Sequence, residues 1–227
     1  MYRKFVNARS PLRLLEKGLH GGLGIGNIGV VVAGHGVGKT PFLVGVALDE
    51  LLRQGRVLHV ALDQTVSHVR AHYDTVYEEL ASSTHLDDAA ATHTEIERNR
   101  SIRVFSPSLF SASKLRDAVK IESEAGGKPS LILIEGLEEI GNEDLHDIRA
   151  LAQEIAAEVW ISGATSGERV NGIPEEFELL GDLLSVVLAL EPGHDAVVLR
   201  ALKDHDAEDL SALHVALDPR TLLLIRN

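Results

Sequence analysis

A glycine-rich loop that ends in a lysine and a threonine carries the clearest chemical signal in the sequence. Residues 33–40 are Ala-Gly-His-Gly-Val-Gly-Lys-Thr. Glycines let a backbone turn so that several N–H groups point at one anion. In such a loop Lys39 can reach the terminal phosphates of a nucleotide, and the hydroxyl of Thr40 can bind Mg²⁺. The pattern predicts a nucleoside-triphosphate site formed by Gly34, His35, Gly36, Val37, Gly38, Lys39 and Thr40.

The segments on either side of this loop fit the same interpretation. Residues 28–32 are apolar except for Gly29, and they have the length and β-branching of a buried strand. A helix is expected to begin near Lys39, and its N-terminus would direct a partial positive charge at a bound phosphate. Residues 42–52 are apolar almost all round, so this helix should be buried against a sheet. The first loop position is Ala33 where glycine is usual, and a small residue suffices there.

Beyond the loop, strand and helix patterns alternate along the chain. Further strands are expected at residues 56–62, 102–105, 131–134, 159–162, 183–190 and 196–202, with a terminal hairpin of 213–217 and 222–225. Helices are expected within 11–26, from the cap Thr65 to about residue 80, from Ser111 or Ser113 to 124, and after the cap Asn142. Residues 81–100 are expected to be a mobile connection with at most a short helix near 94–98. The order predicts one α/β domain over residues 1–227: a largely parallel twisted sheet with helices on both faces and antiparallel C-terminal strands.

Composition limits the kinds of partner. The 227 residues carry 22 Lys plus Arg against 34 Asp plus Glu, a net charge of −12, and only 4% are aromatic. Such a chain offers little to a phosphate backbone or to unstacked bases, so nucleic acid is not expected as a partner. There is no cysteine, no apolar run near the ~20 residues of a membrane span, and no apolar signal sequence. A cytoplasmic protein without a membrane partner is therefore expected.

Five features in order resemble the RecA-like P-loop ATPases, in the branch of the KaiC-like circadian-clock proteins and the ATPase domain of hexameric replicative helicases. They are Leu19-His20-Gly21-Gly22-Leu23, the glycine-rich loop, Asp63 after the second strand, Glu135 after the fourth, and Leu202-Lys203-Asp204-His205. The resemblance spans about residues 12–225. It implies an ATPase that uses ATP and Mg²⁺, and a possible homo-oligomer with a hexamer-type interface.

The resemblance also implies roles for three side chains. Asp63 would polarise the attacking water, Glu135 would join Thr40 in the Mg²⁺ shell, and Lys203 would reach the nucleotide of a neighbouring subunit. For Glu135 there is an independent reason, because a carboxylate buried at this edge is costly without a cation or a donor. The family usually has Glu where this chain has Asp63, Asp where it has Glu135, and Arg where it has His205. Asp63 can equally be a turn residue, and Lys203 a surface charge.

Other polar residues carry weaker signals. Ser162 and Thr165, at the end of the fifth strand, could sense the γ-phosphate, but a loop rich in small polar residues predicts the same letters. The eleven histidines have no metal-binding spacing and are expected at solvated positions, as is the pair Glu138-Glu139. The leading hypothesis is a slow ATPase coupled to assembly with itself or with a protein partner. The alternatives are a non-hydrolysing adenine-nucleotide sensor and, third, a nucleic-acid motor.

Overall fold

The computed structural model describes residues 1–137, 140–165, 170 and 172–227. Its strands are β1 Ile28–Ala33, β2 Val57–Leu62, β3 Arg100–Phe105, β4 Leu131–Glu135, β5 Glu158–Ala164, β6 Val186–Pro192, β7 Val197–Asp204, β8 Val215–Leu217 and β9 Leu224–Arg226. Its α-helices are α1 Arg3–Ala8, α2 Leu12–Gly18, α3 Lys39–Leu52, α4 Val66–Thr84, α5 Ala89–Asn99, α6 Ala112–Ala125, α7 Asn142–Ile155 and α8 Glu175–Glu178, and η1 Pro107–Leu109 is a 3₁₀ turn.

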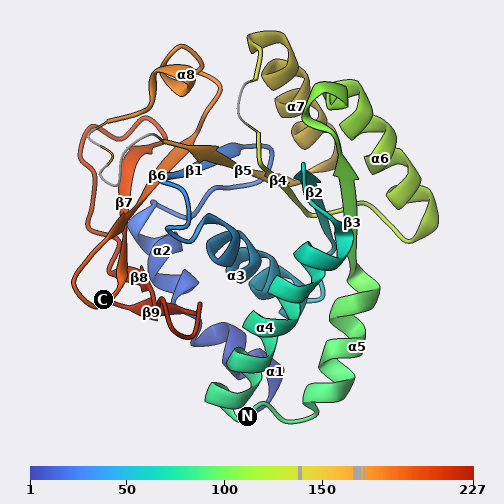
Figure 1. Ribbon diagram of the computed structural model, residues 1–227, viewed down its shortest axis with the longest axis vertical. Helices are drawn as coiled ribbons and strands as arrows, with labels where there is room; N and C mark the ends of the chain where they lie inside the picture. The colour runs from blue at the N-terminus through green and yellow to red at the C-terminus, as the bar shows by residue number, and fades with distance from the viewer. Residues whose placement is uncertain (138–139, 166–169, 171) are drawn as a thin grey trace.

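All the strands form one sheet in the order β3-β2-β4-β5-β1-β6-β7-β8-β9 (Figure 1). In this order the strands from β3 through β1 to β6 all run parallel. Strands β7, β8 and β9 then continue the sheet, each antiparallel to its neighbour. Every residue of β1, β2 and β4 is buried, as expected of parallel strands covered on both faces. The predicted α/β architecture, with its antiparallel C-terminal strands, is therefore confirmed.

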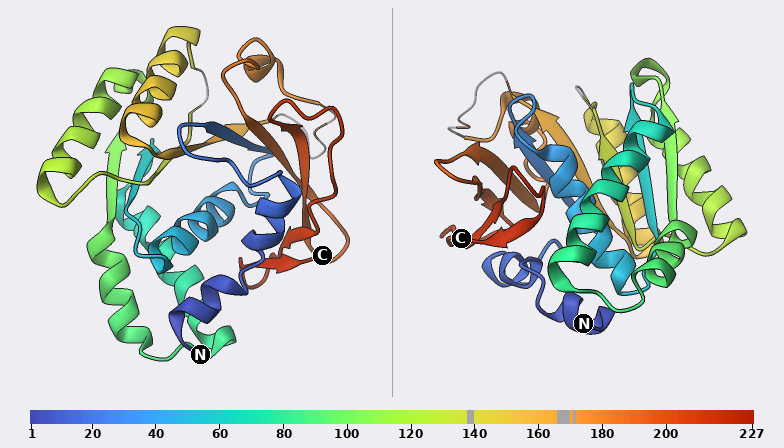
Figure 2. Two further views of the ribbon diagram at one scale, coloured as in Figure 1. Left: turned by 180° about the vertical axis from the view of Figure 1, so that it is seen from behind. Right: turned by 60° about the horizontal axis from the view of Figure 1, so that its bottom comes forward.

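Helices cover both faces of the sheet, and each face has its own core. Helices α1 to α4 lie on one face, while α6 and α7 lie on the other (Figures 1 and 2). Alternate residues of β1 divide between the two cores: Val31 packs in the first and Val30 and Val32 in the second. Helix α3 belongs to the first core, and its N-terminus is the end that follows the glycine-rich loop. The sheet thus fixes both the loop and the direction of the helix behind it.

The C-terminal strands lie beside the glycine-rich loop and α3, where leucines of β8 and β9 approach two glycines. A Cβ added to Gly38 would lie 2.4 Å from Cδ2 of Leu217 in β8, and the φ of Gly38 is +128°. The backbone conformation of Gly38 therefore disfavours any side chain there, and the Leu217 side chain would have to move to admit one. Leu224 of β9 lies beside Gly45 of α3 in the same way, with 3.3 Å to an added Cβ. Leu217 and Leu224, near the end of the chain, thus pack against the glycine-rich loop and the helix that follows it.

The expectation for the segment after α4 is wrong. Residues 81–100 are not a mobile connection, because α4 continues to Thr84 and α5 spans Ala89–Asn99. His85 and Asp88 adopt left-handed conformations, with φ of 48° and 53°, which make the turn between the helices tight. The few apolar residues of α5 suffice because Ile96 is buried against the rest of the first core. Helix α5 is thus held by tertiary contacts rather than by its own composition.

Helix starts were predicted with mixed success. The side chain of Thr65 accepts a hydrogen bond from His68 N, and that of Ser111 accepts one from Lys114 N, so both caps are confirmed. Asn142 is not a cap: it is the first residue of α7, and Gly141 precedes it as the N-cap. Among the residues that the structure describes, no helix is both long and apolar enough to cross a membrane.

Candidate functional site

The glycine-rich loop folds around the ammonium group of Lys39. Its Nζ donates hydrogen bonds to the carbonyl oxygens of Ala33, at 2.8 Å, and of Gly34, at 3.1 Å. Gly36 has a φ of +74°, which glycine adopts without strain. Burial lowers the pKa of Lys39, and the charge of Glu135 opposes that change. The ammonium group of Lys39 thus lies at the N-terminus of α3, where the helix dipole and the free backbone N–H groups also favour an anion.

Thr40 and Glu135 meet directly at this helix N-terminus. The Thr40 hydroxyl donates a hydrogen bond to Oε1 of Glu135. The other carboxylate oxygen, Oε2, lies 3.2 Å from Nε2 of His59 in β2. On the far side of the ring, Nδ1 of His59 lies 3.1 Å from the hydroxyl of Tyr73 in α4. Four polar side chains from the loop helix, two strands and α4 therefore form one connected row.

The surroundings of Glu135 favour its charged form. Burial by itself raises the pKa of Glu135, but the hydrogen bonds from His59 and from the hydroxyl of Thr40 lower it, and the net change is downward. The side chain is buried, at 6% exposed, so an unpaired charge there would be expensive. Glu135 therefore presents a buried carboxylate with one oxygen directed at Thr40.

The neighbouring strand ends lie at the same edge of the sheet. Ala61 of β2 pairs in register with Glu135, so Asp63 leaves β2 two residues beyond that pair. A Cβ added to Gly136, whose φ is +82°, would lie only 2.8 Å from the carbonyl oxygen of Leu62. Asp63 is exposed and adopts a left-handed φ of 56°. Its conformation suits a turn, and its place at the carboxyl edge of the sheet suits a group that polarises a water, so both interpretations of Asp63 stand.

The two polar residues after the predicted fifth strand also lie at this edge. The hydroxyl of buried Ser162 accepts a hydrogen bond from Gly136 N at 3.1 Å. The backbone N–H of Thr165 donates to the carbonyl of Ala33, at 3.1 Å. Ser162 therefore ties β5 to the exit of β4, and Thr165 ties the end of β5 to the start of the glycine-rich loop.

Lys203 lies away from the glycine-rich loop of its own chain. In the sheet it pairs with Val187 of β6, which in turn pairs with Val30 near the start of β1. The loop follows the other end of β1. The ammonium group of Lys203 donates to the carbonyl of Gly181. Lys203 is therefore placed toward the amino-terminal end of β1, away from the loop of its own chain.

Two of the sequence features that carried the family resemblance lie side by side. Nδ1 of His20 is 2.5 Å from Oδ2 of Asp204, although 184 positions separate them. Nε2 of His205 lies 2.9 Å from the carbonyl oxygen of Gly22, to which it donates. Asp204 is only 1% exposed. The segment before β1 and the segment after β7 therefore form one structural unit at the amino-terminal edge of β1.

Sequence reasoning missed His59 and Tyr73. The expectation that histidines occupy solvated positions is wrong for His59, which is 0% exposed. A signal was present, because His59 is the only polar residue in the apolar run of residues 57–62. A polar side chain inside a strand covered on both faces needs hydrogen-bond partners. Which partners it would find depended on the strand order and could not be deduced from the sequence.

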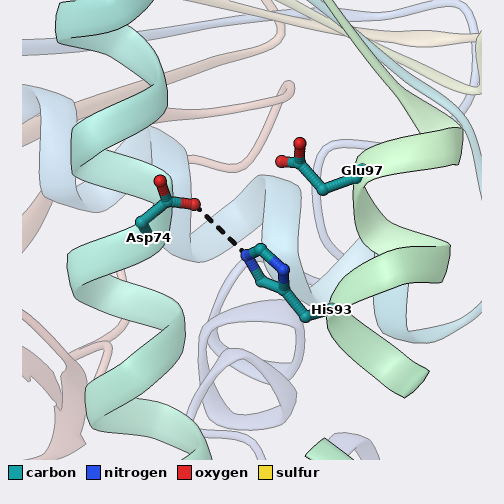
Figure 3. Close-up of side chains that lie close together, drawn as sticks. All are labelled: Asp74, His93 and Glu97. Carbon is teal, nitrogen blue, oxygen red and sulfur yellow. Dashed lines mark hydrogen bonds and ion pairs between the residues drawn. The ribbon is translucent and has the colours of Figure 1, made fainter. Parts of the chain in front are cut away.

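A second group of ligand-type side chains lies between α4 and α5, apart from the loop (Figure 3). His93 Nε2 is 3.2 Å from Oδ1 of Asp74, and Glu97 lies close by. However, Glu97 is also ion-paired with Arg70 and with Arg100. Two guanidinium groups offset the two carboxylates, which removes the excess negative charge that would attract a cation. This group does not contribute to the candidate site.

Comparison with known proteins found no protein-family model and no curated protein that matches this chain. Membership of a family is therefore an inference from the motifs and their arrangement.

Glu138 and Glu139, expected on a solvated face, lie outside the described residues.

Proposed function

We propose that this chain is an ATP-binding, Mg²⁺-dependent P-loop ATPase of the RecA-like type, with slow hydrolysis coupled to assembly with itself or with a protein partner. The observation that carries the proposal is the contact of Thr40 with Glu135 beside the half-buried Lys39. A hydroxyl, a carboxylate and a lysine at the N-terminus of one helix are the groups that a metal–nucleotide complex requires.

The donor set fits Mg²⁺. Magnesium prefers oxygen ligands and is usually held by one or two protein groups together with water and substrate phosphates. Thr40 and Glu135 would supply those protein oxygens. When bound, Mg²⁺ would neutralise negative charge that develops on the phosphates during transfer.

The loop and its helix would bind and orient the phosphates. The strand order supports this location, because β1 lies between β5 and β6 while β2 and β3 lie farther out on one side. Ligands of open α/β sheets bind at the carboxyl ends of strands where the order changes direction in this way. The backbone N–H groups of the loop, the ammonium of Lys39 and the N-terminus of α3 then act together on one anion.

Hydrolysis would need groups that an isolated chain supplies poorly. Asp63 has a shorter side chain than the glutamate usual in the resembled family, which limits its reach to an attacking water. Lys203 lies at the other end of β1 and bonds to Gly181. A cation delivered from a neighbouring subunit can make a large contribution to phosphoryl transfer. Turnover should therefore be slow in the monomer and faster in an assembly.

A non-hydrolysing adenine-nucleotide sensor is the second candidate. The left-handed turn at Asp63 and the engagement of Lys203 within its own chain favour it. Phosphate release, measured together with ATP affinity, separates the two: an ATPase that has bound ATP releases phosphate steadily over time, whereas a sensor binds ATP and releases no phosphate. The preference for adenine over guanine rests on the family resemblance alone.

The direct test is mass spectrometry of nucleotide carried through purification, followed by phosphate-release assays with Mg²⁺. The proposal expects ATP or ADP on the protein and Mg²⁺-dependent release. A protein that carries no nucleotide and binds none when ATP is added would contradict it.

A further inference from the structure

The row Thr40–Glu135–His59–Tyr73 contains two residues to which the proposed function gives no role. His59 is wholly buried in β2 and Tyr73 is 1% exposed in α4. Their only polar neighbours at hydrogen-bonding distance among the described residues are each other and Glu135. Buried polar groups are kept where their hydrogen bonds are satisfied, so the arrangement of protons along this row can be worked out.

The chemistry of the row fixes the tautomer of His59. An ionised Glu135 can only accept, so Nε2 of His59 must carry the proton and donate to Oε2. In this tautomer Nδ1 is the acceptor, and the hydroxyl of Tyr73 donates to it. Burial raises the pKa of Tyr73 far above its ordinary value, so this hydroxyl keeps its proton. In the opposite tautomer a lone pair of Nε2 would face the carboxylate.

In this arrangement the two carboxylate oxygens of Glu135 have different partners. Oε2 is held by His59, and Oε1 faces Thr40. A glutamate side chain has several rotatable bonds, and a partner behind one oxygen removes most of that freedom before a ligand arrives. Groups that orient a metal ligand in this way typically change metal affinity by about 10- to 100-fold when removed.

We propose that His59 is a positioning residue that directs Oε1 of Glu135 toward the cation of the bound nucleotide, and that Tyr73 fixes the tautomer in which His59 does so. The inference rests on the proposed function, since the cation arrives with ATP. It adds two residues, from β2 and α4, to the machinery that distinguishes the magnesium complex of ATP from free ATP.

The test measures ATP affinity of the full chain by calorimetry, once with Mg²⁺ and once with EDTA. The ratio of the two dissociation constants reports the contribution of the metal. We expect His59→Leu to reduce this ratio about tenfold, while affinity in EDTA stays within about threefold. His59→Gln places an amide N–H near the position of Nε2 and should recover most of the ratio. His93→Leu is the matched control, because His93 also pairs with a carboxylate but lies between α4 and α5.

The tautomer is tested separately with Tyr73→Phe, which removes only the hydroxyl. Nitrogen-15 chemical shifts of the imidazole should show the Nε2–H form of His59 in the wild type and lose that signature in Tyr73→Phe, with the Mg²⁺ ratio falling as well. Tyr73→Phe therefore tests the positioning role even if His59→Leu does not fold.

Three outcomes would overturn the inference, each in a different way. An unchanged Mg²⁺ ratio in folded His59→Leu, or in Tyr73→Phe with an unchanged tautomer, would show that the row does not position Glu135. An equal loss of affinity with Mg²⁺ and with EDTA would show that His59 only supports the fold. Absence of ATP binding in the wild type would instead remove the proposed function, and this inference with it.

Discussion

The hydroxyl of Thr40 at the N-terminus of α3 donates to the carboxylate of Glu135 at the end of β4, across 95 positions of sequence. The contact exists because α3 runs beneath the sheet from the end of β1, while β4 approaches the same edge two strands away. This hydroxyl and carboxylate, beside the half-buried Lys39, are the groups that would hold the metal–phosphate complex of the proposed function.

The position of Lys203 leads to a prediction about assembly. Because Lys203 lies away from the loop of its own chain, ATPase activity per subunit should rise with protein concentration. Lys203→Ala should lower turnover and leave ATP affinity within about threefold, roughly 0.7 kcal/mol, since its contact would form in the transition state. Steady-state phosphate release across a concentration series, with calorimetry alongside, checks both statements. Lys120→Ala, an exposed lysine of α6, is the control.

Mixing two inactive variants tests whether Lys203 acts between subunits. Lys203→Ala and Asp63→Asn subunits should each be slow, and a mixture should regain some activity because some interfaces then contain both groups. If activity per subunit is flat with concentration and the mixture is as slow as its parts, Lys203 has no role across an interface, and the sensor becomes the better description.

Nucleic acid should bind weakly. The net charge of −12 opposes a phosphate backbone, and aromatic residues are scarce. Labelled single-stranded DNA in a fluorescence-anisotropy titration near 150 mM salt should show no binding at micromolar concentration, with or without ATP. Micromolar affinity that changes with ATP would restore the nucleic-acid motor as a candidate.

Glu158 gives a prediction about pH. It lines a cavity of about 270 Å³ together with Glu16 and Glu50. Burial raises the pKa of Glu158, and the charge of Glu50 raises it further. A carboxyl whose pKa is higher in the folded state costs stability as the pH rises above its unfolded value, about 4.3. At pH 7 Glu158→Gln should therefore be more stable than the wild type.

Thermal unfolding at two pH values measures this effect. The midpoint of Glu158→Gln should exceed that of the wild type at pH 7 by roughly 1–4 °C, about 0.5–1 kcal/mol for a chain of this length. Near pH 3.5 the difference should shrink toward zero, because the carboxyl is then protonated in both states. Glu124→Gln, an exposed residue of α6, should change the midpoint little at either pH. A lower midpoint for Glu158→Gln at pH 7 would contradict the prediction.

Much of the sheet could be predicted from the sequence because buried parallel strands are continuous aliphatic runs. Residues 28–32, 56–62 and 131–134 each match an observed strand to within a residue or so. Helix α5 could not be predicted, since its stability comes from the burial of Ile96 in a core made by distant segments. Composition alone does not reveal such support.

The same distinction applies to the candidate site, where some residues are close in sequence and others meet only in the folded chain. The loop, Lys39 and Thr40 are local in sequence, and their spacing alone indicates phosphate binding. The partners of Glu135 are set by strand order, so His59 and Tyr73 emerge only when β2, β4 and α4 are placed together. The pairing of His20 with Asp204 is likewise a product of the tertiary fold.

Calorimetry of ATP binding to Lys39→Ala is the most direct test of nucleotide binding at this loop. Lys39 is the cation that the loop encloses, with its Nζ bonded to the carbonyl oxygens of Ala33 and Gly34. Its loss should lower ATP affinity at least tenfold, about 1.4 kcal/mol, a modest demand for a charge-assisted contact with phosphate. Lys120→Ala should bind as the wild type does. If folded Lys39→Ala binds ATP with wild-type affinity, the loop is not the nucleotide site.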